Sequence, residues 1–240
     1  MTAIEVKKLT KKYKDKVAVN EIDLSINQGE LFALLGTNGA GKTTTIKMLS
    51  GLILPTSGEI KIEDMDMKKD MFKIKEILNV SPQETAIAPN LTVKENLEFM
   101  AGVYQIKNKE EKIAELVKQF KLDEVLKKKA KTLSGGWQRK VSIAIALIND
   151  PKILFLDEPT LGLDVIARKE LWKVINGLKG KITIILTTHY MEEAESLSDR
   201  IGIMANGKLV DIGTAEELIK KTGAKNFEDA FVSIATGGEL

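Results

Sequence analysis

The chain has 240 residues, a length that predicts one or two domains with enough residues to bury a sizeable core. Its 36 Lys and Arg residues nearly balance 34 Asp and Glu residues, so the net charge of +2 argues against bulk attraction to nucleic acid or to an anionic membrane surface. The absence of cysteine excludes disulfides and thiolate metal sites and suits a cytosolic protein.

The sequence predicts neither a secretion signal nor a membrane span. The first ten residues, MTAIEVKKLT, lack the apolar core of a secretory leader. The longest apolar run, VSIAIALI at residues 141 to 148, still contains a serine. We therefore expect the chain to contain no membrane-spanning segment.

Residues 31 to 51, LFALLGTNGAGKTTTIKMLSG, predict a buried strand, a glycine-rich loop and a helix. Residues 31 to 35 suit the strand, and residues 43 to 50 suit a helix that Gly51 closes. Lys42 then lies at the positive end of the helix dipole, where a lysine is unfavourable unless a strong anion binds beside it. The stretch matches the phosphate-binding pattern G-x-x-x-x-G-K-[ST] at Gly36, Gly41, Lys42 and Thr43.

This pattern predicts a polyphosphate site. Loop N–H groups cradle the phosphates, the lysine reaches the β and γ oxygens, and the threonine hydroxyl holds Mg²⁺. The alternative, a glycine-rich turn that only precedes a helix, is disfavoured by the flanking strand and helix, and a dinucleotide fingerprint is excluded because Thr44 replaces its third glycine. The predicted binding residues are Gly36, Thr37, Asn38, Gly39, Ala40, Gly41, Lys42, Thr43 and Thr44.

Residues 84 to 150 are patterned as helices, whereas the sequence on either side alternates strands with helices. A capping box at Thr92 and Glu95 predicts the start of one helix. Two apolar stripes predict core-facing surfaces, at Val93, Leu97, Met100 and Tyr104 and at Ile113, Leu116, Val117 and Phe120. We therefore expect one α/β domain over residues 1 to 240, with a catalytic core of residues 1 to 83 and 151 to 240, an antiparallel β-rich N-terminal portion and a helical subdomain of residues 84 to 150.

The stretch LSGGWQ, residues 133 to 138, opens an apolar helix that runs to about Ile148. Ser134 could cap this helix, with Gly135 and Gly136 allowing tight packing. Alternatively, a small hydroxyl and two glycines leave the helix N-terminus bare enough to touch a phosphate. The spacing alone does not choose between these two interpretations.

The stretch KILFLDEPT, residues 152 to 160, predicts an apolar strand that ends in two adjacent carboxylates. Because side chains alternate along a strand, Asp157 and Glu158 point in different directions and can take separate roles. In a phosphate site, Asp157 can hold Mg²⁺ through its water shell, and Glu158 can act as general base on the attacking water. The alternative is a strand followed by a polar turn at Pro159.

The single histidine, His189, follows another apolar strand, ITIILTT at residues 182 to 188. A lone histidine is ordinarily a structural residue. In a parallel sheet, however, ligands gather at the carboxyl ends of the strands, where Gly36, Asp157 and His189 meet if their strands are neighbours. This position predicts a functional histidine.

Together these motifs resemble the nucleotide-binding subunit of an ATP-binding-cassette (ABC) transporter. The resemblance covers nearly the whole chain and rests on LSGGWQ followed by ILFLDEPTLGLD. It implies a P-loop NTPase core that hydrolyses ATP with Mg²⁺. It also implies that Ser134, Gly135 and Gly136 contact the γ-phosphate of ATP held by a second protomer. Trp137 departs from the common signature, which has glutamine there, and this departure bears on the geometry of the partner.

Further roles follow from the same resemblance. Tyr13 matches the aromatic residue that stacks on adenine, and Gln83 in SPQET matches the glutamine that senses Mg²⁺ and the attacking water. Gly162 and Asp164 match the loop that links the two ATP sites of a dimer. The resemblance thus implies catalytic roles for Lys42, Gln83, Glu158 and His189 and metal contacts for Thr43, Gln83 and Asp157.

The resemblance implies a transmembrane permease subunit and a second ATPase subunit as partners, the latter as an ATP-dependent homodimer at the cytoplasmic face of the membrane, with no nucleic acid bound. The stretches ETAIAPNLTVKENLEF, GGWQRKVSIAIALI and NFEDAFVSIATGGE resemble ATPases of two-component exporters that move drugs, lipids, polysaccharides or sodium ions. Export is therefore expected. Apolar residues in the irregular stretch after Gln83, including Ile87 and Leu91, predict the surface on which the membrane subunit docks.

Three other classes compete with this interpretation. A soluble ABC-type ATPase acting on nucleic acid or ribosomes usually has two cassettes or a long coiled coil, whereas this chain has one set of motifs. A GTPase switch would need N-K-x-D, and NKEE at residues 108 to 111 lacks the aspartate. A regulatory module without turnover is disfavoured because the expected base, Glu158, is present.

Overall fold

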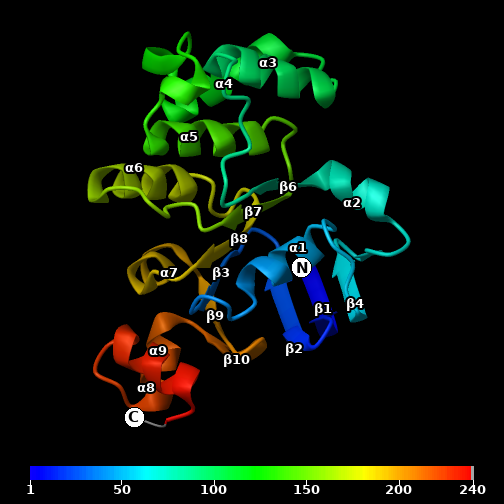
Figure 1. Cartoon of the computed structure of the whole chain (residues 1–240), viewed down its shortest axis with the longest axis vertical. Coiled ribbons are helices and arrows are strands. Elements are labelled where there is room, and N and C mark those ends of the chain that lie inside the picture. Colours follow the sequence, from blue (N-terminus) through cyan, green and yellow to red (C-terminus); the bar gives the residue numbers. More distant parts are fainter. Residues whose placement is uncertain (239–240) are drawn as a thin grey trace.

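The computed structural model describes residues 1–238 as two β-sheets flanked by helices (Figure 1). The first sheet is antiparallel, in the order β2-β1-β4-β5. Ile22, Leu24 and Ile26 of β2 are buried while Asp23 and Ser25 between them are exposed, as expected for a sheet with one covered face. Its strands are β1 (Thr2–Tyr13), β2 (Lys16–Asn27), β4 (Ser57–Ile62) and β5 (Met65–Asp66).

The second sheet has the order β10-β9-β3-β8-β7-β6, with every strand parallel to its neighbours except the edge strand β10. Every residue of β3, β7 and β8 is buried, which suits parallel strands covered on both faces. Because β8 lies between β3 and β7, the predicted meeting of their carboxyl ends is confirmed. The strands are β3 (Leu31–Gly36), β6 (Leu78–Ser81), β7 (Ile153–Asp157), β8 (Thr183–Thr188), β9 (Arg200–Ala205) and β10 (Lys208–Gly213).

Helix α1 (Lys42–Leu49) follows β3 directly and joins the two sheets through one apolar cluster. Ile46 of α1 packs in this cluster with Ile4 of β1 and Phe155 of β7. The predicted strand, loop and helix over residues 31 to 51 are therefore confirmed. Since α1 is held by both sheets, the loop at its N-terminus is presented by a rigid support.

The helices between β6 and β7 form a separate layer at the end of the molecule opposite α8 and α9 (Figure 1). The capping box at Thr92 and Glu95 is present, and both predicted apolar stripes pack inward, with Met100 and Tyr104 half-buried. Leu97, Phe120 and Val141 share one apolar cluster with Leu156 of β7, so these helices rest on the main sheet. The elements of this layer are α3 (Val93–Val103), α4 (Lys109–Phe120), two short 3-10 turns (Asp123–Val125 and Ala130–Thr132) and α5 (Gly135–Ala146). Helix α2 (Met71–Ile77) comes before β6 in the chain.

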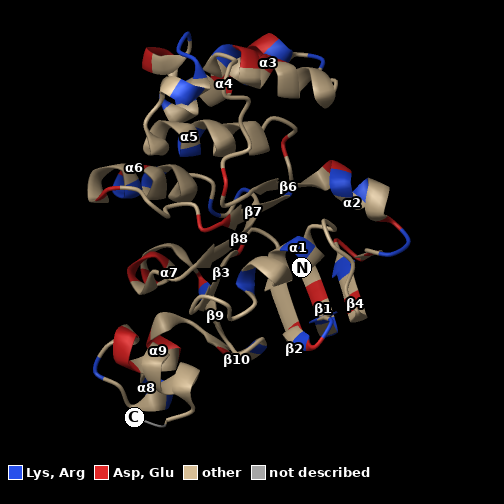
Figure 2. Ribbon diagram, in the orientation of Figure 1, with Lys and Arg blue, Asp and Glu red and all other residues tan. Residues whose placement is uncertain are grey.

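The remaining helices cover the main sheet and its β9 edge. Phe227 and Leu218 from the last two helices pack with Ile201 and Ile203 of β9. These elements are α6 (Val165–Asn176), α7 (Met191–Leu197), α8 (Ala215–Thr222) and α9 (Phe227–Thr236). None of the helices in residues 1–238 is both long enough and apolar enough to cross a membrane. Basic and acidic residues both occur in the sheets and in the helical layer, in keeping with the small net charge (Figure 2).

Candidate functional site

The glycine-rich loop between β3 and α1 leaves the start of the helix open. Gly41 has φ 106°, and a Cβ atom there would lie 2.5 Å from the main-chain oxygen of Ala18, so this position accepts only glycine. The first turn of α1 contains no acidic residue, and no side chain caps its N-terminus. N–H groups of the helix start are therefore left for an anion.

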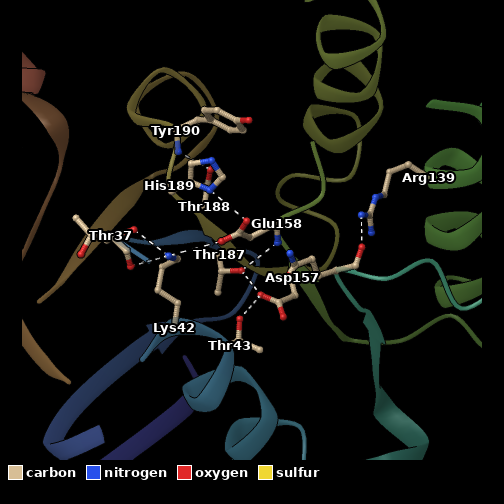
Figure 3. Close-up of polar contacts among 12 residues, drawn as sticks. Thr37, Lys42, Thr43, Arg139, Asp157, Glu158, Thr187, Thr188, His189 and Tyr190 are labelled. Carbon is tan, nitrogen blue, oxygen red and sulfur yellow. Dashed lines mark hydrogen bonds and ion pairs between the residues drawn. The ribbon is translucent and has the colours of Figure 1, made fainter. Parts of the chain in front are cut away.

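Lys42 places a buried ammonium group at this loop. Its side chain is 4% exposed, and Nζ donates hydrogen bonds to the main-chain oxygens of Gly36 at 2.8 Å and Thr37 at 3.2 Å (Figure 3). Burial lowers the pKa of Lys42, while Glu158 and Asp157 oppose that effect. The loop thus holds a cation beside an open helix N-terminus, the arrangement that a polyphosphate needs.

Asp157, the last residue of β7, lies behind the loop on the helix side. Its Oδ1 accepts hydrogen bonds from Thr43 Oγ1 at 3.2 Å and from Thr187 Oγ1 at 2.5 Å (Figure 3). A hydroxyl and a carboxylate oxygen are hard donors that suit Mg²⁺, which commonly takes one or two protein ligands and completes its shell with water and phosphate oxygens. Residues 1–238 offer no group of three or more His, Cys, Asp or Glu that would suit a metal held by protein alone. The donors at Thr43 and Asp157 therefore fit Mg²⁺ bound together with a phosphate ligand.

Glu158 turns away from Asp157 and toward the loop. Its backbone has a left-handed φ of 46°, and its N–H donates to the Thr187 carbonyl at 3.1 Å and to Thr187 Oγ1 at 3.0 Å. Its carboxylate reaches Lys42 Nζ with Oε1 at 3.6 Å and His189 Nδ1 with Oε2 at 3.1 Å (Figure 3). The two adjacent carboxylates are thus directed to different partners.

A cavity of about 480 Å³ collects most of the predicted residues. Its volume lies within the range of small-molecule sites, about 300–1,000 Å³. The lining residues are Lys16, Ala18, Asn38, Gly39, Ala40, Gly41, Lys42, Thr43, Thr44, Gln83, Glu158, Leu161 and His189. Four segments distant in sequence, the glycine loop, Gln83, the end of β7 and the end of β8, therefore meet at one place.

The other predicted residues lie outside this cavity. Gly36, Thr37 and Asp157 do not line the cavity but hydrogen-bond to residues that do. Gly36 and Thr37 accept from Lys42, and Asp157 accepts from Thr43. Tyr13 is 48% exposed, and the centre of its ring lies 5.1 Å from Nζ of Lys11. It pairs across the β1–β2 hairpin with Lys16, which does line the cavity.

Ser134, Gly135 and Gly136 form the start of α5, away from the glycine loop. Ser134 is the N-cap residue of α5, but its side chain makes no capping hydrogen bond. Ser134 and Gly135 are exposed, and Gly136 is half-buried. The hydroxyl is therefore left available on the surface, in contrast to the capping interpretation of LSGGWQ.

Lys16, Thr187 and Arg139 are polar residues at or beside the site that reasoning from the sequence missed. Thr187 binds Asp157 and Glu158, and its position at the end of the strand with His189 could have indicated it. Arg139 donates to the carbonyl oxygens of Pro82 at 2.6 Å and Gln83 at 2.5 Å. No pattern in the sequence marked Arg139, because its neighbours Gln138 and Lys140 in α5 are also polar.

A second cavity, of about 640 Å³, lies between α4, α5 and α6. Leu116, Phe120 and Val174 contribute apolar surface to it, and Lys140 and Glu170 lie at its border. It contains none of the predicted site residues, so its larger size does not connect it with the phosphate chemistry.

Comparisons with known proteins show which family and which solved structures the chain is similar to. A family model described as "ABC transporter" matches residues 19–161. The probable multidrug ABC transporter ATP-binding protein YbhF of Escherichia coli (strain K12) is 41% identical over 220 residues, which are 90% of this chain but only 38% of that protein. The linearmycin resistance ATP-binding protein LnrL of Bacillus subtilis (strain 168) is 38% identical over 238 residues, covering 98% of this chain and 75% of that protein. A solved dimeric structure of the ATP-binding cassette MJ0796, in a post-hydrolysis state with ADP and Pi, matches with a TM-score of 0.80 and 27% identity over 88% of this chain and 98% of that one.

Proposed function

Because this chain belongs to the ABC transporter family, we propose that it is the ATP-hydrolysing subunit of a membrane transporter, in which ATP-driven closure of a dimer powers export. The observation that carries the proposal is the convergence of Lys42, the Thr43–Asp157 pair and Glu158 around one open helix N-terminus. A cation, a pair of hard oxygen donors and a proton acceptor are the groups that phosphoryl transfer to water requires.

ATP binds, in this proposal, with its phosphates in the glycine loop. The loop from Gly36 to Gly41 and the start of α1 supply N–H donors, and Lys42 exchanges its carbonyl contacts for β and γ phosphate oxygens. Thr44 completes the binding stretch at the first turn of the helix. Tyr13 stacks on adenine, supported by its place in the same hairpin as Lys16, which lines the cavity.

Thr43 and Asp157 would hold Mg²⁺ in this arrangement, and Gln83, which lines the same cavity, would supply a further contact. When bound, Mg²⁺ neutralises charge on the phosphate oxygens. Thr187 keeps the Asp157 carboxylate oriented through the hydrogen bond to Oδ1. These roles follow from donor chemistry and from the direct contact between Thr43 and Asp157.

Glu158 accepts a proton from the attacking water as general base. Its contact with His189 orients the carboxylate, and Lys42 balances the carboxylate charge until the phosphates arrive. His189 then lies where it can donate a hydrogen bond to the γ-phosphate or to the water. Gln83 completes the cavity wall and positions the water.

Hydrolysis in this proposal needs a second copy of the chain. Ser134, Gly135 and Gly136 do not line the cavity of their own chain, and the exposed, uncapped start of α5 supports contact with the γ-phosphate on a partner. Gly162 and Asp164 belong to the connection between the two sites. Trp137 is half-buried and lies under the Lys140 ammonium group at 4.6 Å, which supports a packing role for the residue that departs from the usual signature.

The membrane partner and the location are part of the same proposal. A transmembrane permease subunit holds the chain at the cytoplasmic face of the membrane, and residues 84 to 150 act as a helical subdomain between residues 1 to 83 and 151 to 240 of the catalytic core. The names of the Escherichia coli and Bacillus subtilis relatives, for multidrug transport and drug resistance, support export. They do not support the alternative of a soluble ATPase acting on nucleic acid or ribosomes.

Phosphate release tests the enzymatic part of this proposal. The purified chain should release phosphate from ATP in MgCl₂ and lose this activity in EDTA. Absence of Mg²⁺-dependent release at concentrations that permit dimer formation would contradict the proposal. The transport part is tested separately, by identifying the membrane protein that co-purifies with the chain in mild detergent.

A further inference from the structure

Arg139 is a buried cation whose contacts are with the main chain. The residue is 4% exposed and belongs to the second turn of α5. Its two terminal nitrogens donate to the carbonyl oxygens of Pro82 and Gln83, while Nε is buried with no partner among residues 1–238. The guanidinium group thus binds two consecutive peptide carbonyls just beyond β6.

Burying the Arg139 guanidinium group in this way costs folding free energy, so we expect its position to serve a purpose. Burying a charged group without a paired charge is unfavourable, and burial lowers the pKa of Arg139 against the opposing effect of Asp157 and Glu193. The rigid planar fork of a guanidinium group has two terminal nitrogens, one for each of two neighbouring carbonyl acceptors. Charge-assisted hydrogen bonds of this kind are stronger than neutral ones, so they hold the two carbonyls firmly.

The segment that Arg139 holds leads directly into the nucleotide cavity. Gln83, whose carbonyl accepts from Arg139, lines that cavity. A second contact joins β6 to α5 one turn further along the helix, where the buried hydroxyls of Ser81 and Ser142 are hydrogen-bonded at 3.0 Å. At its far end the segment is fixed to α3, because Asn96 accepts from Ala88 N–H at 2.7 Å and donates to the Ala88 carbonyl at 3.1 Å.

We propose that Arg139 is a positioning residue that fixes Gln83 to α5. The same helix begins at Gly135, so any shift of its N-terminus on contact with a second protomer moves Arg139 and the backbone of Gln83 as one unit. Arg139 therefore links the exposed Ser134 region to the cavity of its own chain. This inference rests on the proposed ATPase function and assigns a role to a residue that does not line the nucleotide cavity.

The test compares Arg139→Met with Lys140→Met. Methionine is unbranched and fills similar space without N–H donors. Lys140 is the adjacent buried cation, but it pairs with Glu170 at 2.7 Å and borders the other cavity, so it is a matched control. Displacing a catalytic group by about 1 Å can cost about 10²-fold, so Arg139→Met should lower kcat about 10- to 100-fold while KM for ATP changes less than about threefold. Lys140→Met should leave kcat within about threefold of the parental value.

A double-mutant comparison shows whether the effect passes through Gln83. In a Gln83→Ala background, Arg139→Met should lower kcat by less than about threefold, because the residue it positions is already gone. Amide hydrogen exchange in residues 83 to 88 should be faster in Arg139→Met and unchanged in Lys140→Met. Parental kcat, a KM that rises as kcat falls, effects that multiply with Gln83→Ala, or unchanged exchange would each overturn the proposal.

Failure of the proposed ATPase function can be distinguished from failure of the anchoring role of Arg139. If the parental chain releases no phosphate, the ATPase assignment fails, and hydrogen exchange alone still decides whether Arg139 anchors Gln83. If Arg139→Met shows no cooperative unfolding transition, Arg139→Gln takes its place. That variant stays polar but is uncharged and has a single amide nitrogen in place of the two terminal nitrogens of arginine, so parental kcat together with parental exchange would overturn the anchoring role.

Discussion

The ammonium nitrogen of Lys42 lies 3.6 Å from Oε1 of Glu158, between side chains that are 4% and 10% exposed. The second oxygen of this carboxylate lies 3.1 Å from Nδ1 of His189. A proton acceptor is therefore held between the cation expected to bind phosphates and the single imidazole of the chain. Substitutions at these three residues should separate phosphate binding from proton transfer.

Glu158→Gln should stop hydrolysis while preserving ATP binding. The amide keeps the shape of the side chain but cannot accept a proton from water, so turnover should fall about 10²- to 10⁴-fold. Phosphate release measures the loss, and gel filtration with ATP should reveal an accumulated dimer. Parental turnover in this variant would show that Glu158 is not the base.

Lys42→Ala should weaken nucleotide binding itself. Loss of a hydrogen bond to a charged group costs about 1.5–3 kcal/mol, which corresponds to an increase in Kd of about 10- to 100-fold. Titration with a fluorescent ATP analogue measures the change, and Lys47→Ala, an exposed lysine on the same helix, is the control. Undiminished affinity and turnover for Lys42→Ala would refute the phosphate role of the loop.

His189→Ala should lower turnover more than binding, because the imidazole contacts the base and borders the cavity. Removing one donor to developing charge typically costs about 10²- to 10³-fold in kcat, whereas Kd for ATP should change little. Separate measurement of kcat and of ATP affinity checks this expectation. Full activity would make His189 a structural residue.

Ser134→Arg should leave the monomer folded and able to bind ATP, since the side chain is exposed and makes no cap. The added bulk should block closure on a second protomer, so that neither ATP-dependent dimerisation nor turnover remains. Gel filtration and ATP binding distinguish these two steps. A variant that still dimerises and hydrolyses ATP would show that LSGGWQ is only the start of a helix.

The buried carboxyl group of Glu193 leads to a prediction about how the stability of the fold depends on pH. Burial raises the pKa of Glu193 above 4.5, against the opposing effect of donors that include Trp172, whose Nε1 donates to Oε1 at 3.0 Å. A carboxyl with a higher pKa in the folded state favours folding most below its unfolded pKa, and that contribution is lost as pH rises through the folded pKa. Glu193→Gln should therefore raise the melting temperature at pH 7 to 8, with a difference that shrinks toward pH 4.5. A lower melting temperature at pH 8, or an unchanged dependence on pH, would contradict this expectation.

The phosphate loop could be predicted because its chemistry is local. The apolar strand, the glycines and Lys42 occur in one short stretch, and the requirement for glycine at Gly41 comes from its own backbone and the adjacent hairpin. The capping box at Thr92 and Glu95 was predictable for the same reason. The meeting of Gly36, Asp157 and His189 depended on strand order, which a parallel sheet with ligands at its carboxyl edge made a reasonable expectation.

Contacts set by tertiary packing could not be read from the sequence. Arg139 meets Pro82 and Gln83 only because α5 crosses the end of β6, and no spacing encodes that crossing. Ile87, expected in a docking surface, is half-buried and packs against the apolar core of the helical layer. A charged residue at Ile87 would therefore disturb packing as well as docking, whereas Phe99, which is 60% exposed on α3, offers a cleaner test of the surface.

At Glu158, the stability of the fold and the catalytic role favour different residues, because the backbone there is left-handed. A non-glycine residue at φ 46° carries a strain of about 1–3 kcal/mol, which the two contacts with Thr187 hold in place. Glycine and asparagine accept this conformation at lower cost but offer no carboxylate. Laboratory selection of this chain for heat resistance alone would therefore favour replacement of Glu158, and a library screened in that way would gain robustness by discarding its most active members.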